Sequence, residues 1–211
     1  MVNFESFTSA KVWDKAVMHL SRNDPAMKTL SKKHGRIRIK LHKNYYESLV
    51  SAIIAQQLAW SAANSITKKF KTLFNGNIPE PALFLKTSEK KVRSSGISPQ
   101  KYSYIKDLCI RIESSQLEIT KFQHMEDEAI ISELDEVRGI GRWTAEMFLM
   151  FTLGRTDVVP TDDLGIRKSI KEIYGLRDLP KKDKVLKLAE KWHPYGSVAC
   201  LYLWHSHDNS K

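Results

Sequence analysis

Two adjacent carboxylates, Asp162 and Asp163, lie where a helix is expected to begin, directly after Pro160 and Thr161. A carboxylate can stabilise a developing positive charge or take a proton from an attacking water molecule. An Asp in the first turn also caps backbone amides and meets the positive end of the helix dipole without doing chemistry. Because a helix needs only one such cap, the pair leaves one carboxylate for another task.

A second segment precedes this pair and carries two glycines, in the sequence Gly-Ile-Gly at residues 139–141. Glycines at this spacing let the chain turn tightly and expose successive amides at the start of the next helix, which suits a phosphate. The segment resembles a helix-hairpin-helix DNA-binding motif. The alternative is a tight turn between two helices with no ligand.

The elements that must position these residues are helical, since apolar residues recur three and four apart. We expect an all-α protein of roughly nine or ten helices. A break near Gln57 and Leu58 divides the first long segment, and Gly175 ends a later one. The expected ranges are residues 45–74, 99–113, 127–137, 142–153, 161–174, 180–192 and 195–205.

Composition limits the class of partner and the compartment. The 34 Lys and Arg exceed the 24 Asp and Glu, giving a formal charge of +10, so a nucleic acid or an anionic membrane is a candidate partner. Basic proteins without such a partner are also common. No apolar run long enough to span a bilayer and no signal peptide is recognisable. Cys109 and Cys200 each lie in an apolar helical stretch and are expected as buried thiols in a reducing interior. Two cysteines are too few for an iron–sulfur cluster, which needs four ligands.

The hairpin and an Asp placed 20 residues after Trp143 are together similar to the helix-hairpin-helix DNA glycosylase superfamily. The sequence of residues 139–145 resembles that of the 3-methyladenine DNA glycosylase II branch, which acts on alkylated purines. Residues 51–58, residues 96–98 with Lys101, and residues 192–194 with Trp204 also agree, so the likeness runs from about residue 45 to 205. Larger bacterial relatives carry an N-terminal β domain, for which the 40 or so preceding residues leave no room.

The resemblance implies two helical subdomains with a base pocket in the cleft between them. One would comprise residues 1–40 and 150–211, and the other residues 41–149, ending in the hairpin motif at 134–153. It assigns the catalytic role to Asp163, whose carboxylate would stabilise positive charge on the sugar. Asp162 is then expected to be the helix cap, although sequence spacing allows the two to share the work.

The resemblance also implies the residues of the base pocket. Trp143 and Trp204 would be its aromatic walls, since a cationic alkylpurine stacks on indole. Met147 and Leu164 stand where larger relatives have pocket tyrosines. The alternative for a Trp in an apolar helix is the core, and this is expected of Trp13, Trp60 and Trp192. Trp143 also occupies the position of the Schiff-base Lys of strand-nicking members, which indicates an enzyme without lyase activity.

Contacts to DNA are expected from the hairpin and from the break at residues 57–58. Leu58, with Gln57, would fill the gap left by a flipped nucleotide, and the alternative for Leu58 is a core position. The remaining predicted DNA contacts come from Gly139, Gly141, Arg142, Thr144 and Lys168. No metal site made by side chains and no cofactor is expected, apart from a monovalent cation held by hairpin carbonyls.

The sequence therefore predicts a glycosylase that removes 3-methyladenine or 7-methylguanine from double-stranded DNA. We expect a monomer with no membrane partner, in the nucleoid of a prokaryote or the nucleus of a eukaryote. Two alternatives stay open. One is a DNA-binding protein that uses the hairpin without cutting any bond. The other is a glycosylase for deaminated or oxidised bases, because selectivity depends on pocket shape and lesion stacking.

Overall fold

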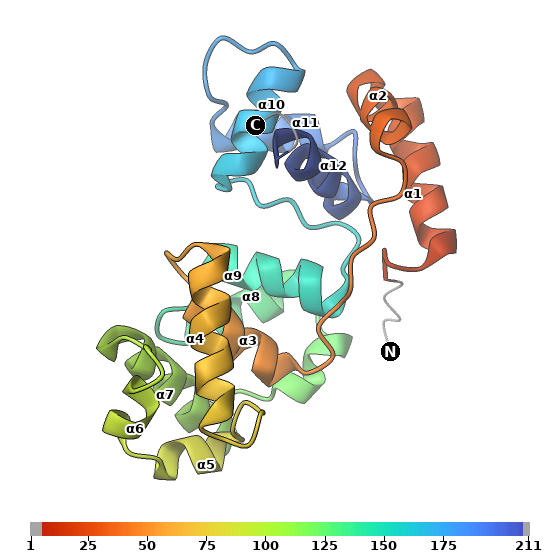
Figure 1. Cartoon of the computed structure of the whole chain (residues 1–211). Coiled ribbons are helices and arrows are strands. Elements are labelled where there is room, and N and C mark those ends of the chain that lie inside the picture. Colours follow the sequence, from red (N-terminus) through yellow and green to blue (C-terminus); the bar gives the residue numbers. More distant parts are fainter. Residues whose placement is uncertain (1–5, 209–211) are drawn as a thin grey trace. The chain divides into compact units, whose positions relative to one another are not determined.

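Figure 1 shows the computed structural model of the chain, which describes residues 6–208. Within that range it has twelve α-helices, one 3-10 helix, one π-helical turn and no strand. The all-α prediction is confirmed. The helix count exceeds the expected one partly because α5 (Pro81–Lys86) and α6 (Glu89–Arg93) are too short to show an apolar period.

The chain divides into two compact units, and the first comprises residues 42–145. Helix α3 packs against α4 and α7, and α7 also packs against α5 and α6. Polar residues set the helix starts: the side chain of Asn44 caps α3, and Ser98 caps α7 with Pro99 at the first helical position. Its remaining helices and their bounds are α3 (Tyr45–Ala55), α4 (Trp60–Thr72), α7 (Pro99–Glu113), η1 (Ile119–His124), α8 (Asp127–Asp135) and the start of α9 (Arg142–Phe148).

The second unit comprises the described residues before 42 together with residues 146–208. Its N-terminal helices α1 and α2 pack against the C-terminal helix α12, which also packs against α10 (Figure 1). The buried Asp24 joins distant segments, because it caps α2 and accepts hydrogen bonds from Tyr174 and Trp192 at 2.6 and 3.0 Å. The helices are α1 (Ala10–Asn23), α2 (Pro25–His34), η2 (Leu149–Leu153), α10 (Leu164–Ile173), α11 (Lys182–Ala189) and α12 (Gly196–Asp208).

Six of the seven expected ranges differ from the observed helices by one to five residues at one end or both, and the range 99–113 agrees with α7. The break in residues 45–74 is confirmed, since α3 ends at Ala55 and α4 begins at Trp60. The segment 142–153 is α-helical only to Phe148 and continues as the π-helical turn η2. Helix α10 begins at Leu164, three residues later than expected, and Gly175 with φ of 61° follows its end as predicted.

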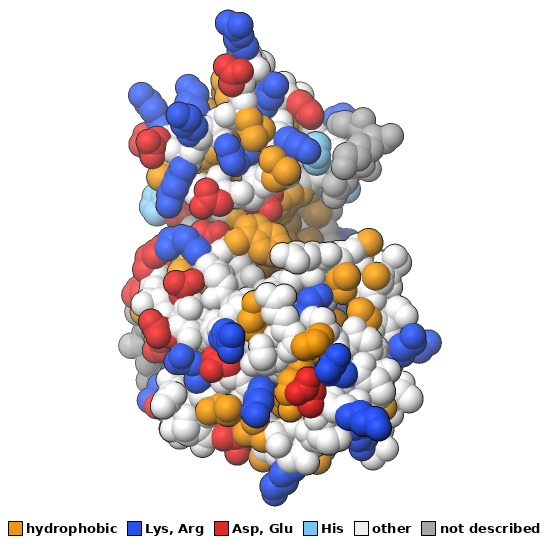
Figure 2. All heavy atoms as spheres, turned by 90° about the vertical axis from the view of Figure 1, so that its left-hand side faces the viewer, with side chains coloured by type: hydrophobic (Ala, Val, Ile, Leu, Met, Phe, Trp, Pro, Cys, Tyr) orange, Lys and Arg blue, Asp and Glu red, His pale blue; other side chains and the backbone are white. Residues whose placement is uncertain are grey.

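The two cysteines, the apolar character of the helices and the surface charges can be compared with what the sequence predicts. Cys109 and Cys200 are both buried and free, as predicted. None of the helices in the described range has the length and apolar character needed to cross a membrane. On the face drawn in Figure 2, Lys and Arg side chains are spread over each unit, with acidic side chains between them.

Candidate DNA-binding and catalytic site

The hairpin lies between the end of α8 at Asp135 and the start of α9 at Arg142. Ile140 is buried and its amide donates to Val137 O at 2.9 Å, which closes the turn. Gly139 has φ of 84°, and a Cβ built there would lie 2.1 Å from Cδ2 of Tyr104. Only glycine fits this position. At Gly141 the nearest neighbour of a Cβ would be 4.0 Å away and φ is not positive, so the turn itself requires glycine at residue 139 and not at residue 141.

Side chains from α7 and from the end of α3 hold the hairpin in place. Gln56 Nε2 donates to Gly139 O at 2.7 Å. Asp107 Oδ2 accepts from the amide of Arg138 at 2.9 Å and from Arg111 Nε at 3.1 Å. Sequence analysis did not single out Tyr104 or Asp107, because their role depends on contacts with residues about thirty positions away.

Lys101 fixes the segment that carries the predicted wedge. Its Nζ donates to the carbonyls of Ile54 and Gln56, both at 2.7 Å, at the end of α3. Desolvation by burial lowers the pKa of Lys101. Gln57 takes a left-handed φ of 56°, and Leu58 is 38% exposed, so the core alternative for Leu58 is wrong.

These residues surround a cavity of about 380 Å³ that lies within the first unit. Trp143, the second residue of α9, is 47% exposed, which makes the core alternative wrong for this residue. The side chain of Thr144 is buried. The cavity is lined by Gln56, Gln57, Gln100, Lys101, Tyr104, Gly139, Gly141, Trp143 and Thr144.

Asp163 lies in the second unit and is itself the cap of α10. Its Oδ1 accepts from the amide of Ile166 at 2.8 Å and from Trp204 Nε1 at 2.9 Å. The expectation that Asp162 would be the cap is wrong, because α10 begins only after Asp163, and Asp162 is exposed in the preceding turn. The same carboxylate therefore caps the helix and binds an indole.

The Asp163–Trp204 pair depends on two residues that the sequence did not point out. A Cβ at Gly165 would lie 3.1 Å from both Asp163 Oδ1 and Trp204 Cδ1, so a glycine allows their close approach. Phe151 packs against Trp204 with ring centroids 5.9 Å apart. Of the other predicted pocket residues in this unit, Met147 is half-buried and Leu164 is exposed.

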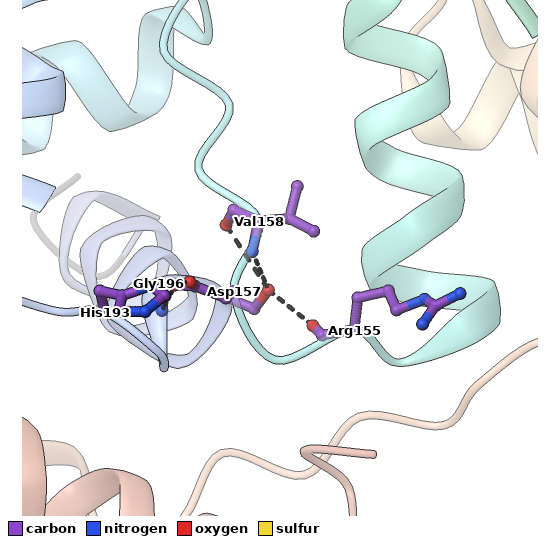
Figure 3. Close-up of polar contacts among 6 residues, drawn as sticks. Arg155, Asp157, Val158, His193 and Gly196 are labelled. Atoms are coloured by element: carbon purple, nitrogen blue, oxygen red, sulfur yellow. Dashed lines mark hydrogen bonds and ion pairs between the residues drawn. The ribbon is translucent and has the colours of Figure 1, made fainter. Parts of the chain in front are cut away.

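A polar network ties the segment before Asp163 to the start of α12, the helix that carries Trp204 (Figure 3). Asp157 accepts from the amide of Gly196 at 2.9 Å and pairs with the imidazole of His193. The hydroxyl of Ser197 donates to Arg155 O at 2.7 Å and accepts from the amide of Val158 at 2.9 Å. The network fixes residues 155–158, the first part of the loop that leads to Asp163, to the start of α12.

Negative charge gathers around the buried Cys200 in the middle of this unit. Burial raises the pKa of its thiol well above the usual value, and the charges of Asp163, Glu146 and Asp157 add to the effect. Glu146 is itself buried, as is Arg155. Neither was singled out from sequence, where a charged residue on a helix is most often solvent-exposed.

The predicted phosphate-binding side chains lie on exposed surfaces. Arg142 forms an ion pair with Glu128 of α8, with Nη1 and Oε2 at 3.0 Å, and Lys168 is exposed on α10. Such exposed pairs are weak and exchange readily for other anions. Within residues 6–208, no group of three or more His, Cys, Asp or Glu side chains could hold a metal ion.

Comparison with known proteins defines the class. Residues 50–194 match the HhH-GPD superfamily of base excision DNA repair proteins, and the chain belongs to this family. It is 36% identical to DNA-3-methyladenine glycosylase 1 of Schizosaccharomyces pombe, over 90% of this chain and 86% of that protein. The predicted superfamily and its alkylbase branch are both confirmed.

Solved structures agree with this assignment. The S. pombe 3-methyladenine DNA glycosylase in complex with abasic DNA superposes with a TM-score of 0.83 at 35% identity, covering 92% of this chain and 97% of that one. A DNA-3-methyladenine glycosidase from Bacillus halodurans gives a TM-score of 0.82 at 33% identity, covering 98% and 93%.

Proposed function

We propose that this chain is a monofunctional DNA glycosylase that flips an alkylated purine, 3-methyladenine or 7-methylguanine, out of duplex DNA and hydrolyses its bond to the sugar. The observation that carries the proposal is the Asp163 carboxylate, fixed by Trp204 and by the first turn of α10. The bond from the Ile166 amide alone would be an ordinary helix cap, whereas the second bond, from Trp204, is not needed for capping. The family and its relatives supply the class of reaction.

Asp163 would act on the positive charge that develops on the sugar. As the bond from C1′ to the purine nitrogen breaks, C1′ gains oxocarbenium character. A carboxylate facing it lowers the barrier, and it can also accept the proton that the attacking water loses. The water oxygen bonds to C1′, and the alkylated purine leaves as a neutral base. Because two N–H groups already orient Oδ1, little reorganisation is needed during the reaction.

The amines near the hairpin support the proposed lack of lyase activity. Trp143 provides an indole where strand-nicking relatives provide a lysine. Lys101 lines the same cavity as Trp143, but its Nζ is held by the carbonyls of Ile54 and Gln56. This support for a monofunctional enzyme comes from geometry as well as from the motif.

The remaining site roles belong to the same proposal. Trp143, Trp204, Met147 and Leu164 would contact the base, and Leu58 with Gln57 would fill the vacated place in the duplex. The hairpin amides at Gly139, Gly141 and Thr144, with Arg142 and Lys168, would bind phosphates. Hairpin carbonyls would hold a monovalent cation, and the enzyme would act as a monomer.

Base release from a panel of lesion-containing duplexes tests the proposal. We expect free 3-methyladenine or 7-methylguanine, with equal rates in the presence and absence of EDTA. Release of only hypoxanthine or only an oxidised guanine would show that the enzyme acts on deaminated or oxidised bases and not on alkylated purines. If the protein binds these duplexes and releases no base from any of them, it is a DNA-binding protein and the proposal is wrong.

A further inference from the structure

We propose that Trp60 is a second DNA-contacting side chain, which stacks on a nucleobase beside the gap that Leu58 fills. This inference rests on the proposed function. It begins from an error in the sequence prediction, which placed Trp60 in the core with Trp13 and Trp192. Those two are buried, whereas Trp60 is 81% exposed. The prediction fails because Trp60 is the first residue of α4 and precedes the part of that helix that packs.

The segment carrying Trp60 is held firmly, although its two apolar side chains face solvent. Lys101 binds two carbonyls at its start, and Gln56 ties it to the hairpin at Gly139 O. The amide of Leu58 donates to Ala55 O at 3.2 Å. Leu58 and Trp60 therefore keep a fixed position relative to the hairpin that is proposed to bind phosphates.

The chemistry of a flipped nucleotide explains the use of an indole at this place. Flipping leaves an unpaired partner base and two base pairs without their stacking neighbour. A leucine fills space in the gap, but it offers no aromatic face. An indole offers a flat surface on which any base can stack, which suits an enzyme that meets lesions in many sequences.

Exposure alone does not identify a DNA contact, because single exposed apolar residues are common. Leu83, in the same unit, is 51% exposed but lies on a different helix, α5. What distinguishes Trp60 is its place two residues after Leu58, on a segment bonded to the hairpin. Leu83 is therefore the matched control.

The test compares Trp60→Ala, Trp60→Phe and Leu83→Ala in binding to two duplexes, one intact and one with a stable abasic-site analogue. For Trp60→Ala we expect about tenfold weaker binding to the abasic duplex, the usual loss for one stacked base. Binding to the intact duplex should stay within about twofold, since phosphate contacts dominate it. Trp60→Phe should keep most of the affinity, and Leu83→Ala all of it.

Three results would overturn the inference. Wild-type affinity of Trp60→Ala for the abasic duplex would show that the indole does not stack. An equal loss on both duplexes would show a general surface contact. A change in sedimentation of the free protein on Trp60→Ala would assign the side chain to a contact between copies.

The experiment also separates this inference from the proposed function. Binding to an abasic analogue requires no bond cleavage, so it measures the contribution of Trp60 to DNA affinity even in an inactive protein. If wild-type protein releases no base but Trp60→Ala still loses affinity selectively, the proposed function fails and the Trp60 contact stands. Tryptophan fluorescence gives an independent check, because stacking on a base should quench Trp60. If abasic DNA quenches the wild type and Trp60→Phe to the same extent, Trp60 does not contact the DNA.

Discussion

The two units prepare for the same substrate by different physical means. In residues 42–145, the hairpin is shaped by backbone: a glycine with positive φ, a ring packed against it, and side chains bonded to main-chain groups. In the unit containing residues 146–208, one side-chain charge at Asp163 is oriented by an amide and an indole. Changes in the first unit should therefore alter binding, and changes at Asp163 should alter the rate.

The largest expected effect is on the chemical step in Asp163→Asn. The Asn oxygen can still accept from Ile166 and Trp204, so the fold should be kept, while the charge that we propose to act on the sugar is lost. We expect the single-turnover rate to fall by about a hundred- to a thousandfold, or about 3–4 kcal/mol, with little change in affinity.

Asp162→Asn is the matched control for that substitution. Asp162 is exposed and does not cap α10, so its variant should release base within about twofold of the parent rate. A large loss in this variant would mean that the two carboxylates share the chemistry. If Asp163→Asn releases base at the parent rate, Asp163 takes no part in the chemical step.

The second effect is on the hairpin itself. Gly139→Ala introduces a Cβ into the ring of Tyr104 at a positive φ, and we expect it to lower the free energy of unfolding by about 2–4 kcal/mol. In Gly141→Ala the added Cβ meets no close neighbour, so the free energy of unfolding should stay within about 0.5 kcal/mol of the parent value. Urea unfolding measures both, and equal stability of the two variants would contradict the packing described.

Lys101→Met tests whether the wedge segment depends on its two hydrogen bonds. Removing a charged donor from two carbonyls should lower the free energy of unfolding by about 1–2 kcal/mol and weaken binding to an abasic duplex. Lys106 lies exposed on the same helix, so Lys106→Met controls for loss of charge. If both variants bind abasic DNA alike, Lys101 does not position the segment.

The smallest effect concerns acid stability of the second unit. Burial, followed by the charges of His205 and Lys33, lowers the pKa of His34 from its usual value of 6.5. His34 then binds a proton more readily in the unfolded chain than in the folded one. The free energy of unfolding should therefore fall as the pH drops below the usual His pKa of 6.5. Urea midpoints at about pH 7.5 and 5.5 should differ less in His34→Gln than in the parent, and an equal difference in the two proteins would contradict this role of His34.

Sequence predicted best where function depends on residues close together in the chain. The hairpin and the break at Gln57 are short motifs and were located correctly, whereas the Asp pair lies directly before α10 and not within its first turn. Which Asp caps α10 was wrong, because either can cap and only the observed helix start decides. Trp60 was misplaced because a Trp in an apolar helix is most often buried, whereas Trp60 stands at the exposed start of α4.

What sequence could not show are partners distant along the chain. The fit between Gly139 and Tyr104, and the bonds from Lys101 to α3, join residues whose separation follows no motif. The same holds for Gly165, whose small size matters only because Trp204 approaches Asp163 from another helix. These contacts depend on the tertiary fold.

In the proposed reaction the protein hydrolyses the glycosidic bond and leaves the DNA strand intact. One single-turnover reaction with a duplex containing 7-methylguanine, run with borohydride present, measures it most directly. We predict free 7-methylguanine, a strand that breaks only on later alkali treatment, and no covalent complex. A borohydride-trapped protein–DNA complex, or a duplex that is bound without any base being released, would contradict the account.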